Sequence, residues 1–160
     1  DFPRQKGGER LCLSDFVASE DPRDPDYVAL FVTTCGRGIR ETARALMDAG
    51  DYVEAHALQA AAIEGAEASA EWLHASLRKA WGFGDPPGTT MQDVFKARYR
   101  GLRVSFGYPA CPNLEDQATL FDLLEPATIG VTLTEGFMME PEASVSALVF
   151  SHPDARYFGA

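Results

Sequence analysis

The chain has 160 residues and a formal net charge of −10, and 46% of its residues are hydrophobic against 24% that are charged. This length and composition are typical of one globular domain, and no apolar run reaches the roughly 18 residues that a membrane span needs. The negative charge argues against general nucleic-acid binding, because phosphate contacts need a basic surface. The three cysteines lack CxxC spacing and the three histidines are scattered, which predicts reduced thiols and no metal site.

The first quarter of the chain alternates between apolar runs and turns. Residues 11–17 and 27–34 are rich in apolar and β-branched side chains, so both are predicted to be strands. The polar segment 19–26 contains two prolines and is the predicted turn between them. Residues 38–47 predict a short helix that ends at Gly50.

The longest predicted element is a helix over residues 51–80, a segment that contains no proline. Gly65 in its middle costs roughly 1 kcal/mol relative to alanine, so we expect close packing or a ligand at that point. A stripe of mostly small side chains at helical spacing predicts that another backbone approaches closely, with Trp72 as the one large anchor. The stripe consists of Leu58, Ala61, Ala62, Gly65, Ala68, Ser69, Trp72 and Ser76.

The second half begins with a break rich in glycine and proline, followed by a predicted short helix over residues 91–99. Asn113 is the predicted N-cap of a helix that runs to Leu124. Residues 129–139 and 145–150 then predict two strands, paired antiparallel through a turn that contains Pro141. Strands followed by helices and then by strands favour an α+β fold with a largely antiparallel sheet.

The segment Arg103-Val-Ser-Phe-Gly-Tyr-Pro-Ala-Cys-Pro112 does not fit a packed strand or helix. Its two prolines and its glycine predict a fixed irregular path. Arg103 offers a planar donor fork for a carboxylate or phosphate, and Tyr108 offers an aromatic face and a hydroxyl. Two interpretations of the residues remain open: a small-molecule site, or a surface loop whose arginine is structural.

The charges are unevenly distributed along the chain. Lys96, Arg98, Arg100 and Arg103 lie within eight positions, whereas the segment from 111 to 142 contains seven acids and no lysine or arginine. This pattern suits an anionic ligand or an acidic partner near Arg103. For the first three basic residues, a solvated helix face is the favoured interpretation.

Four ordered segments resemble the C-terminal activation domain of cobalamin-dependent methionine synthase. Residues 103–112 are similar to the family's Arg-x-x-x-Gly-Tyr motif, which is followed by Pro-Ala-Cys-Pro. The other matching segments are Cys12-Leu-Ser-Asp-Phe-Val17, Leu133-Thr-Glu-Gly-Phe137, and residues 144–158 with Ser-Val-Ser, Phe-Ser-His-Pro-Asp and Arg-Tyr-Phe.

The resemblance implies an α+β fold with a bent, largely antiparallel sheet and flanking helices, one of them long. The family's first subdomain, with its Asp-Trp segment, has no counterpart in this sequence. We therefore expect residues 1–160 to form a single domain that is the C-terminal part of an activation (reactivation) domain cut from a longer chain.

In this family the Arg-x-x-x-Gly-Tyr motif binds S-adenosylmethionine, and the resemblance carries that role to matching positions. Arg103 is expected to bind the ligand carboxylate, and Glu67, in a segment similar to the family's "AEAFAE", its amino group or ribose. For Glu67 a solvated acidic face with Glu64 and Glu71 is an equally good interpretation. The expected ligand-binding residues are Arg103, Gly107, Tyr108, Ala110, Tyr157, Phe158 and Glu67; the catalytic residues are unknown and no metal ligand is expected.

The resemblance also implies a function: a part of the enzyme 5-methyltetrahydrofolate-homocysteine methyltransferase that supports reactivation of oxidised cobalamin. An electron from flavodoxin or a flavoprotein reductase, followed by a methyl group from S-adenosylmethionine, would convert cob(II)alamin to methylcobalamin in the cytoplasm. The corrinoid is expected on a neighbouring domain of the same enzyme. A non-catalytic S-adenosylmethionine-sensing or protein-interaction module, and an acidic structural domain without a ligand, are the alternatives.

Overall fold

The computed structural model describes residues 2–18 and 26–158, so the predicted turn at 19–26 lies outside the described residues except for Asp26. The chain groups into two compact units. Three of the four boundaries between the units fall inside a strand, the long helix and a second strand. Unit 1 comprises Asp1–Leu30, Leu73–Asn113 and Ala147–Ala160, and unit 2 comprises Phe31–Trp72 and Leu114–Ser146.

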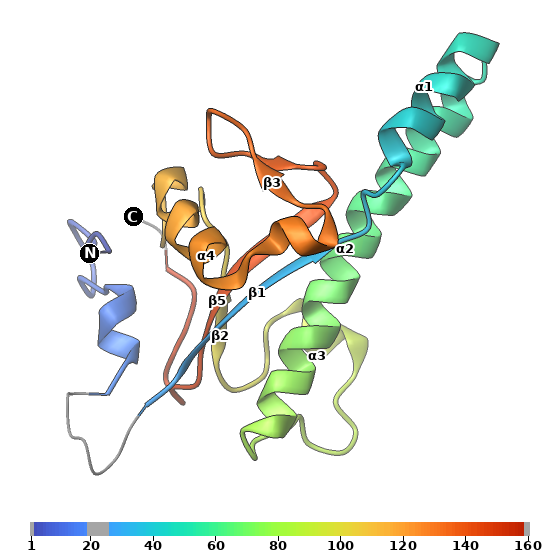
Figure 1. The fold of residues 1–160 in the computed structure, drawn as a ribbon. Helices are drawn as coiled ribbons and strands as arrows, with labels where there is room; N and C mark the ends of the chain where they lie inside the picture. Colours follow the sequence, from blue (N-terminus) through green and yellow to red (C-terminus); the bar gives the residue numbers. More distant parts are fainter. Residues whose placement is uncertain (1, 19–25, 159–160) are drawn as a thin grey trace. The chain divides into compact units, whose positions relative to one another are not determined.

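The main sheet has the strand order β1-β5-β2, formed by β1 (Val28–Thr34), β5 (Ser144–Phe150) and β2 (Leu102–Val104) (Figure 1). β2 runs antiparallel to β5, with Leu102 opposite Phe150 and Val104 opposite Leu148. Every residue of β5 is buried, as expected for the central strand of a covered sheet. The α+β class with a largely antiparallel sheet is confirmed.

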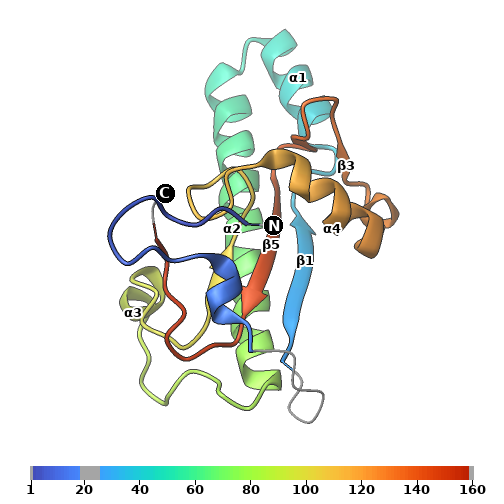
Figure 2. The ribbon, with the colours of Figure 1, turned by 90° about the vertical axis from the view of Figure 1, so that its left-hand side faces the viewer.

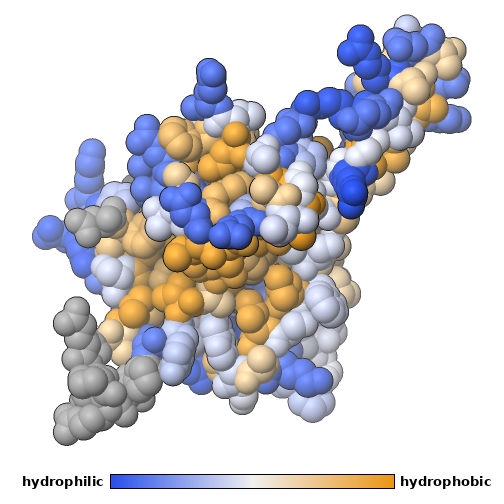
Figure 3. Space-filling view, viewed as in Figure 1, coloured by the Kyte–Doolittle hydropathy of each residue, from blue (hydrophilic) through white to orange (hydrophobic). Residues whose placement is uncertain are grey.

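Unit 2 contains a helical hairpin made of α1 (Ile39–Ala49) and the first part of α2 (Tyr52–Ala80). Gly50 ends α1 in the left-handed conformation with a φ of 92°, a position that favours glycine. Figures 1 and 2 both show α1 side by side with the start of α2. Only Ala43 of α1 is buried, and Figure 3 shows hydrophilic side chains around the free end of this hairpin.

The buried stripe of α2 differs from the predicted one. From Ala62 onward its buried side chains recur every four residues, and Trp72, the predicted anchor, is 71% exposed. The close approach predicted at Gly65 is confirmed, because a Cβ there would lie 3.3 Å from the Sγ of Cys35. The buried α2 residues are Ala55, Ala62, Ala66, Ala70, His74 and Arg78. The helix thus buries alanines near the hairpin and polar side chains near its end.

A second close approach in unit 2 gives a stability prediction. A Cβ on Gly36 would lie 2.5 Å from the Pro141 ring, and a rigid ring cannot move aside as a flexible side chain can. Gly36→Ala should therefore lower the free energy of unfolding by about 1–3 kcal/mol, measured as a lower urea midpoint. Gly7→Ala, with open space around its Cβ, is the control. Equal midpoints for the two variants would contradict the packing described here.

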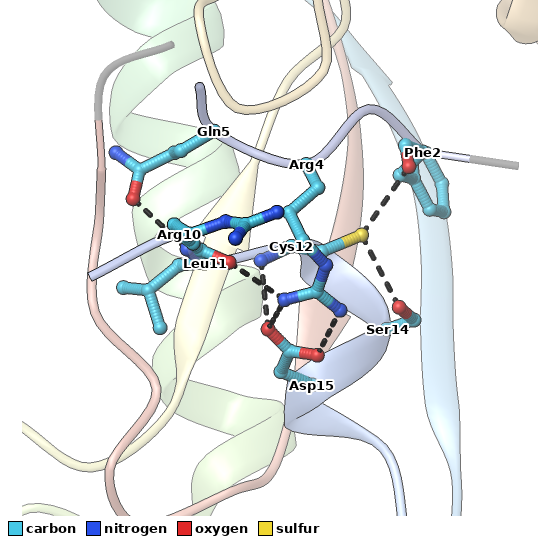
Figure 4. Close-up of polar contacts among 8 residues, drawn as sticks. All are labelled: Phe2, Arg4, Gln5, Arg10, Leu11, Cys12, Ser14 and Asp15. Atoms are coloured by element: carbon cyan, nitrogen blue, oxygen red, sulfur yellow. Dashed lines mark hydrogen bonds and ion pairs between the residues drawn. The ribbon is translucent and has the colours of Figure 1, made fainter. Parts of the chain in front are cut away.

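The predicted strand over residues 11–17 is wrong: Leu13–Phe16 form a 3-10 helix, η1, in unit 1. The Asp15 carboxylate accepts a hydrogen bond from the backbone N–H of Cys12 at 2.9 Å, which caps the helix. Arg4 holds the same carboxylate with two hydrogen bonds of 2.6 and 2.7 Å, as Figure 4 shows. These contacts lower the pKa of Asp15. Local side-chain capping therefore outweighs the strand preference of the apolar residues.

Two predicted helices begin or end elsewhere. α3 (Met91–Phe95) is shorter than the predicted 91–99, because the chain turns at Ala97, whose φ is 49°. A 3-10 turn, η2 (Leu114–Asp116), precedes α4 (Gln117–Leu124), so the N-cap position of α4 is Asp116 and not Asn113.

The long strand predicted over residues 129–139 is also wrong. Pro126–Ile129 form the 3-10 helix η3, and the strands β3 (Thr132–Leu133) and β4 (Met139–Glu140) pair antiparallel with each other. A turn separates them, in which the N–H of Thr134 donates to the carbonyl of Met138. β5 therefore pairs with β2, which the sequence analysis missed, instead of pairing through the Pro141 turn.

Within residues 2–18 and 26–158, none of the helices combines the length and the apolar character that crossing a membrane requires.

Candidate functional site

Arg103 occupies the middle of β2, where it lies opposite Val149 of β5. Its neighbours Leu102 and Val104 are buried, whereas Arg103 is half-buried. Because successive side chains of a strand point to opposite faces, the arginine is held on the more open face of β2. The strand register therefore fixes where the guanidinium emerges.

The loop that follows β2 is a tight turn with an internal hydrogen-bond pattern. The N–H of Cys111 donates to the carbonyl of Tyr108, and the N–H of Gly107 donates to the carbonyl of Cys111, both at 2.8 Å. Pro109 follows the first residue of this four-residue turn, where its fixed φ is favoured, and Gly107 has a φ of 84°. The glycine and prolines of the motif thus produce the fixed irregular path that the sequence analysis predicts.

The side chains of this turn differ in burial. Ala110 and Cys111 are fully buried, while Tyr108 is 57% exposed. The turn therefore presents the aromatic ring of Tyr108 next to β2.

The C-terminal segment brings a second tyrosine to this loop. Tyr157 is 51% exposed, and partial burial together with its neighbour Tyr108 raises the pKa of its hydroxyl. Phe158, by contrast, is buried, with its ring centroid 6.2 Å from that of Phe16. Of the two predicted aromatic contacts in this segment, Tyr157 lies beside the loop and Phe158 packs into the core of unit 1.

Glu67 lies in unit 2, on an exposed position of α2 between the buried residues Ala66 and Ala70. The other six predicted binding residues belong to unit 1. The role of Glu67 stays a prediction.

A buried polar cluster in unit 1 was missed by the sequence analysis. Arg78 is fully buried and donates to both carboxylate oxygens of Asp85, at 2.8 and 2.7 Å. Its guanidinium lies 3.9 Å from the ring centroid of Tyr99, and the His74 ring meets Tyr99 edge-on at 5.1 Å. One sequence signal could have revealed this cluster: the four-residue spacing places positions 74 and 78 on the same helix face as the buried alanines.

His74 is held in its neutral form. Burial lowers its pKa to about 3, and the positive charges of Arg78 and Arg103 contribute in the same direction. The ordinary value is 6.5, so the unfolded chain takes up a proton at His74 between these two pH values while the folded chain does not.

This pKa difference predicts a loss of stability in mild acid. The contribution of neutral His74 to the free energy of unfolding is complete above pH 6.5. It falls as the pH drops toward 3, by about 2 kcal/mol between pH 7 and pH 5. Urea unfolding at the two pH values should show a smaller loss for His74→Phe than for the unaltered chain. His56→Phe, at an exposed site on the same helix, should retain the full loss. Parallel pH dependence in all three proteins would contradict a neutral buried His74.

Two of the four clustered basic residues, Arg98 and Arg100, make local contacts. Arg98 forms an ion pair with Asp93 at 3.2 Å. The guanidinium of Arg100 lies 4.2 Å from the ring centroid of Phe83 and donates to the carbonyl of Ser151 at 3.1 Å. These contacts support the interpretation of Arg98 and Arg100 as surface residues. Both side chains line an open hollow of about 510 Å³.

Comparison with known proteins gives three concordant findings. The sequence profile of a family described as "Vitamin B12 dependent methionine synthase, activation domain" matches residues 1–160. Methionine synthase from Mycobacterium tuberculosis (strain ATCC 25618 / H37Rv) is 38% identical over 172 residues, and that from Mycobacterium leprae (strain TN) is 37% identical over 171. Each alignment covers 98% of this chain but 14% of the relative.

Among solved structures, a crystal structure of the MetH reactivation domain bound to AdoHcy matches with a TM-score of 0.91 and 36% identity. The match covers 99% of this chain and 50% of that one. The fold described above is therefore shared with that domain.

Proposed function

The chain belongs to the family of vitamin B12-dependent methionine synthase activation domains, and on this premise we propose that it binds S-adenosylmethionine and supports the reductive methylation of cobalamin. The observation that carries the proposal is the loop after β2. It places a half-buried arginine, a turn with a buried alanine and two neighbouring tyrosines within one unit. The solved relative with this fold is bound to AdoHcy, the demethylated product of that ligand.

Each loop residue meets one chemical demand of the ligand. The carboxylate takes two charge-assisted hydrogen bonds from the Arg103 fork. Gly107 and Ala110 let the backbone come close to the ligand. Tyr108 and Tyr157 supply aromatic surface for the sulfonium and the adenine. Phe158 supports the site from the core, because it packs on Phe16.

The reaction requires no proton transfer from this chain. Reduced cobalamin, held by a neighbouring domain, would supply the nucleophile that accepts the methyl group, and S-adenosylhomocysteine would be the leaving group. The residues described here therefore act by orienting the methyl donor.

The proposal includes partners and context. Residues 1–160 form the C-terminal part of an activation domain in a longer methionine synthase, which agrees with their coverage of half of the solved reactivation domain. A neighbouring domain of that enzyme binds the cobalamin, and flavodoxin or a flavoprotein reductase donates the electron. The cytoplasm is the proposed compartment, supported by the three free cysteines, Cys12, Cys35 and Cys111.

The test is a reactivation assay on the longer enzyme that carries these residues. After oxidation to cob(II)alamin, chemical reductant plus S-adenosylmethionine should restore activity, and reductant alone should not. Transfer of label from S-[methyl-¹⁴C]adenosylmethionine to the corrinoid identifies the methyl source. Tight binding without any label transfer would instead support a non-catalytic sensing module.

A further inference from the structure

β1 (Val28–Thr34) lies at one edge of the main sheet. The strand order β1-β5-β2 places β5 on one side of β1, and among the described residues no strand pairs with its other side. A free edge exposes a row of backbone N–H and C=O groups that can pair with another extended segment. Natural proteins therefore shorten, charge, bend or cover their edge strands.

The two edges of this sheet differ in how well they are protected. β2, the opposite edge, has three residues, includes the charged Arg103 and is followed by the turn at Pro109. β1 has seven residues with the sequence Val-Ala-Leu-Phe-Val-Thr-Thr, so it contains no charged side chain and no proline. Its β-branched and aromatic residues favour strand pairing. β1 is therefore long enough and apolar enough to accept another strand.

One hydrogen bond at the end of β1 indicates which backbone groups face the free edge. The N–H of Cys35 donates to the carbonyl of Ala143, the residue before β5, at 2.9 Å. Because the backbone groups of successive residues in a strand point to alternate sides, those of Phe31 and Thr33 also point toward β5. The residues whose N–H and C=O groups point to the free edge are Leu30, Val32 and Thr34.

The surface beside this edge is apolar. The Thr33 hydroxyl donates to the carbonyl of Ala66 on α2, so the half-buried Val32 side chain points to the opposite face of the sheet. Figure 3 shows hydrophobic side chains gathered over the part of the surface where Figure 1 shows β1 and α4. Leu123 on α4 and Ile129 on η3 are 66% and 46% exposed. An added strand would cover apolar surface as well as pair backbone groups.

The rest of the reactivation domain is the occupant that fits this edge best. The solved reactivation domain shares the fold of this chain with a TM-score of 0.91, but the match covers only 50% of that domain. A second half of this size, tethered in the same enzyme, has a high effective concentration at the edge. Two copies of this chain, by contrast, each have a net charge of −10 and repel each other.

We propose that the free edge of β1 pairs with an extended segment of the same enzyme, supplied by the half of the reactivation domain that this chain does not span. The pairing uses the outward backbone groups of Leu30, Val32 and Thr34, and apolar side chains of the added segment cover Val32. The inference rests on the proposed place of this chain in a longer methionine synthase, and it does not depend on ligand binding.

Hydrogen–deuterium exchange of the longer enzyme, resolved to single amides by fragmentation in the mass spectrometer, tests the pairing. Phe31 and Thr33 are internal controls, because their amides face β5 and should exchange slowly in either case. In a paired edge, the amides of Leu30, Val32 and Thr34 should exchange at least about 100-fold more slowly than in an unstructured peptide. Slow exchange at the two controls together with fast exchange at these three amides would overturn the proposal.

Two further measurements identify the source of the added strand. A reactivation domain of a relative has been crystallised, so the complete reactivation domain of this enzyme should show the same slow amides as the longer enzyme. Slow exchange in the longer enzyme that is lost in this domain would assign the strand to another domain. Slow exchange that disappears on dilution, together with a dimer in sedimentation, would assign it to a second copy. Either result overturns the proposal.

A charge placed beside the edge provides a matched pair of variants. Val32→Glu puts a carboxylate where apolar cover is expected, so it should speed exchange at the outward amides and leave the amides that face β5 slow. Val53→Glu, the same change at a position of α2 that is 83% exposed, should alter neither set. Equal behaviour of the two variants would contradict the pairing. If Val32→Glu does not fold, exchange in the unaltered enzyme decides.

The same samples separate this inference from the proposed function. Titration with S-adenosylmethionine measures the ligand site, and exchange at β1 measures the edge. A protected edge in an enzyme that does not bind the ligand would refute the proposed function alone. Ligand binding in an enzyme with a freely exchanging edge would refute the pairing alone.

Discussion

Replacing Arg103 with alanine is expected to weaken S-adenosylhomocysteine binding about 100-fold, the largest effect on binding of any single change in the candidate site. A hydrogen bond to a charged group contributes about 1.5–3 kcal/mol, and alanine removes both arms of a bidentate contact. Arg103 is half-buried on β2, and the strand register that places it does not depend on its side chain. Calorimetric titration of the longer enzyme measures the change.

Two variants control this prediction. Arg103→Lys keeps the charge but loses the planar fork, so about a tenfold loss is expected. Arg44→Ala, at an exposed position of α1 in the other unit, should bind as the unaltered protein does. Unchanged affinity in a folded Arg103→Ala variant would mean that the arginine is structural, which is the alternative that the sequence left open.

The change with the largest expected effect on stability is Asp85→Ala, which should lower the free energy of unfolding by about 3–5 kcal/mol. Arg78 is fully buried, and both of its described hydrogen bonds end on the Asp85 carboxylate. Alanine at position 85 would leave a charged guanidinium in the core without that compensation. For a chain of this size, a fall of the melting temperature by roughly 10 °C is expected.

An exposed ion pair with a similar nitrogen–oxygen distance supplies the comparison. Arg40 and Glu140 lie 2.6 Å apart in unit 2, but their side chains are 69% and 37% exposed. Glu140→Ala should therefore cost less than about 1 kcal/mol. Similar losses for the two variants would contradict the burial of Arg78 described here. Thermal unfolding followed by circular dichroism measures both.

Local patterns in the sequence predicted the elements that depend on local chemistry. β1, the hairpin of α1 and α2 and the end of α1 at Gly50 follow from apolar periodicity and a left-handed glycine. The turn at Pro109 is likewise set by the residues within it. The close approach at Gly65 was predictable because a glycine inside a long helix has few other uses.

Elements that depend on distant partners were not predictable in this way. β2 has only three residues and is a strand because β5 lies beside it. Leu13 to Phe16 coil into a 3-10 helix because Asp15 caps it and Arg4 holds that carboxylate. The buried face of α2 was misplaced by one or two residues along the helix, since small side chains alone do not mark which face is covered.

The candidate site likewise contains parts that local sequence predicts and parts that depend on distant segments. The motif from Arg103 to Cys111 could be read directly from the sequence, because its own hydrogen bonds form the turn. The approach of Tyr157 to Tyr108 depends on the path of the C-terminal segment and rested on the family resemblance. His74 and Arg78 share the four-residue spacing of the buried alanines of α2, but polar side chains gave no direct sign that they are fully buried.

The central claim is that this chain contributes a site for S-adenosylmethionine, and equilibrium titration of that ligand into the longer enzyme tests it most directly. The account predicts one saturable site per chain, displaced by S-adenosylhomocysteine and lost in Arg103→Ala. A folded, unaltered enzyme that shows no saturable binding, or that binds equally well with Arg103 replaced, would contradict it.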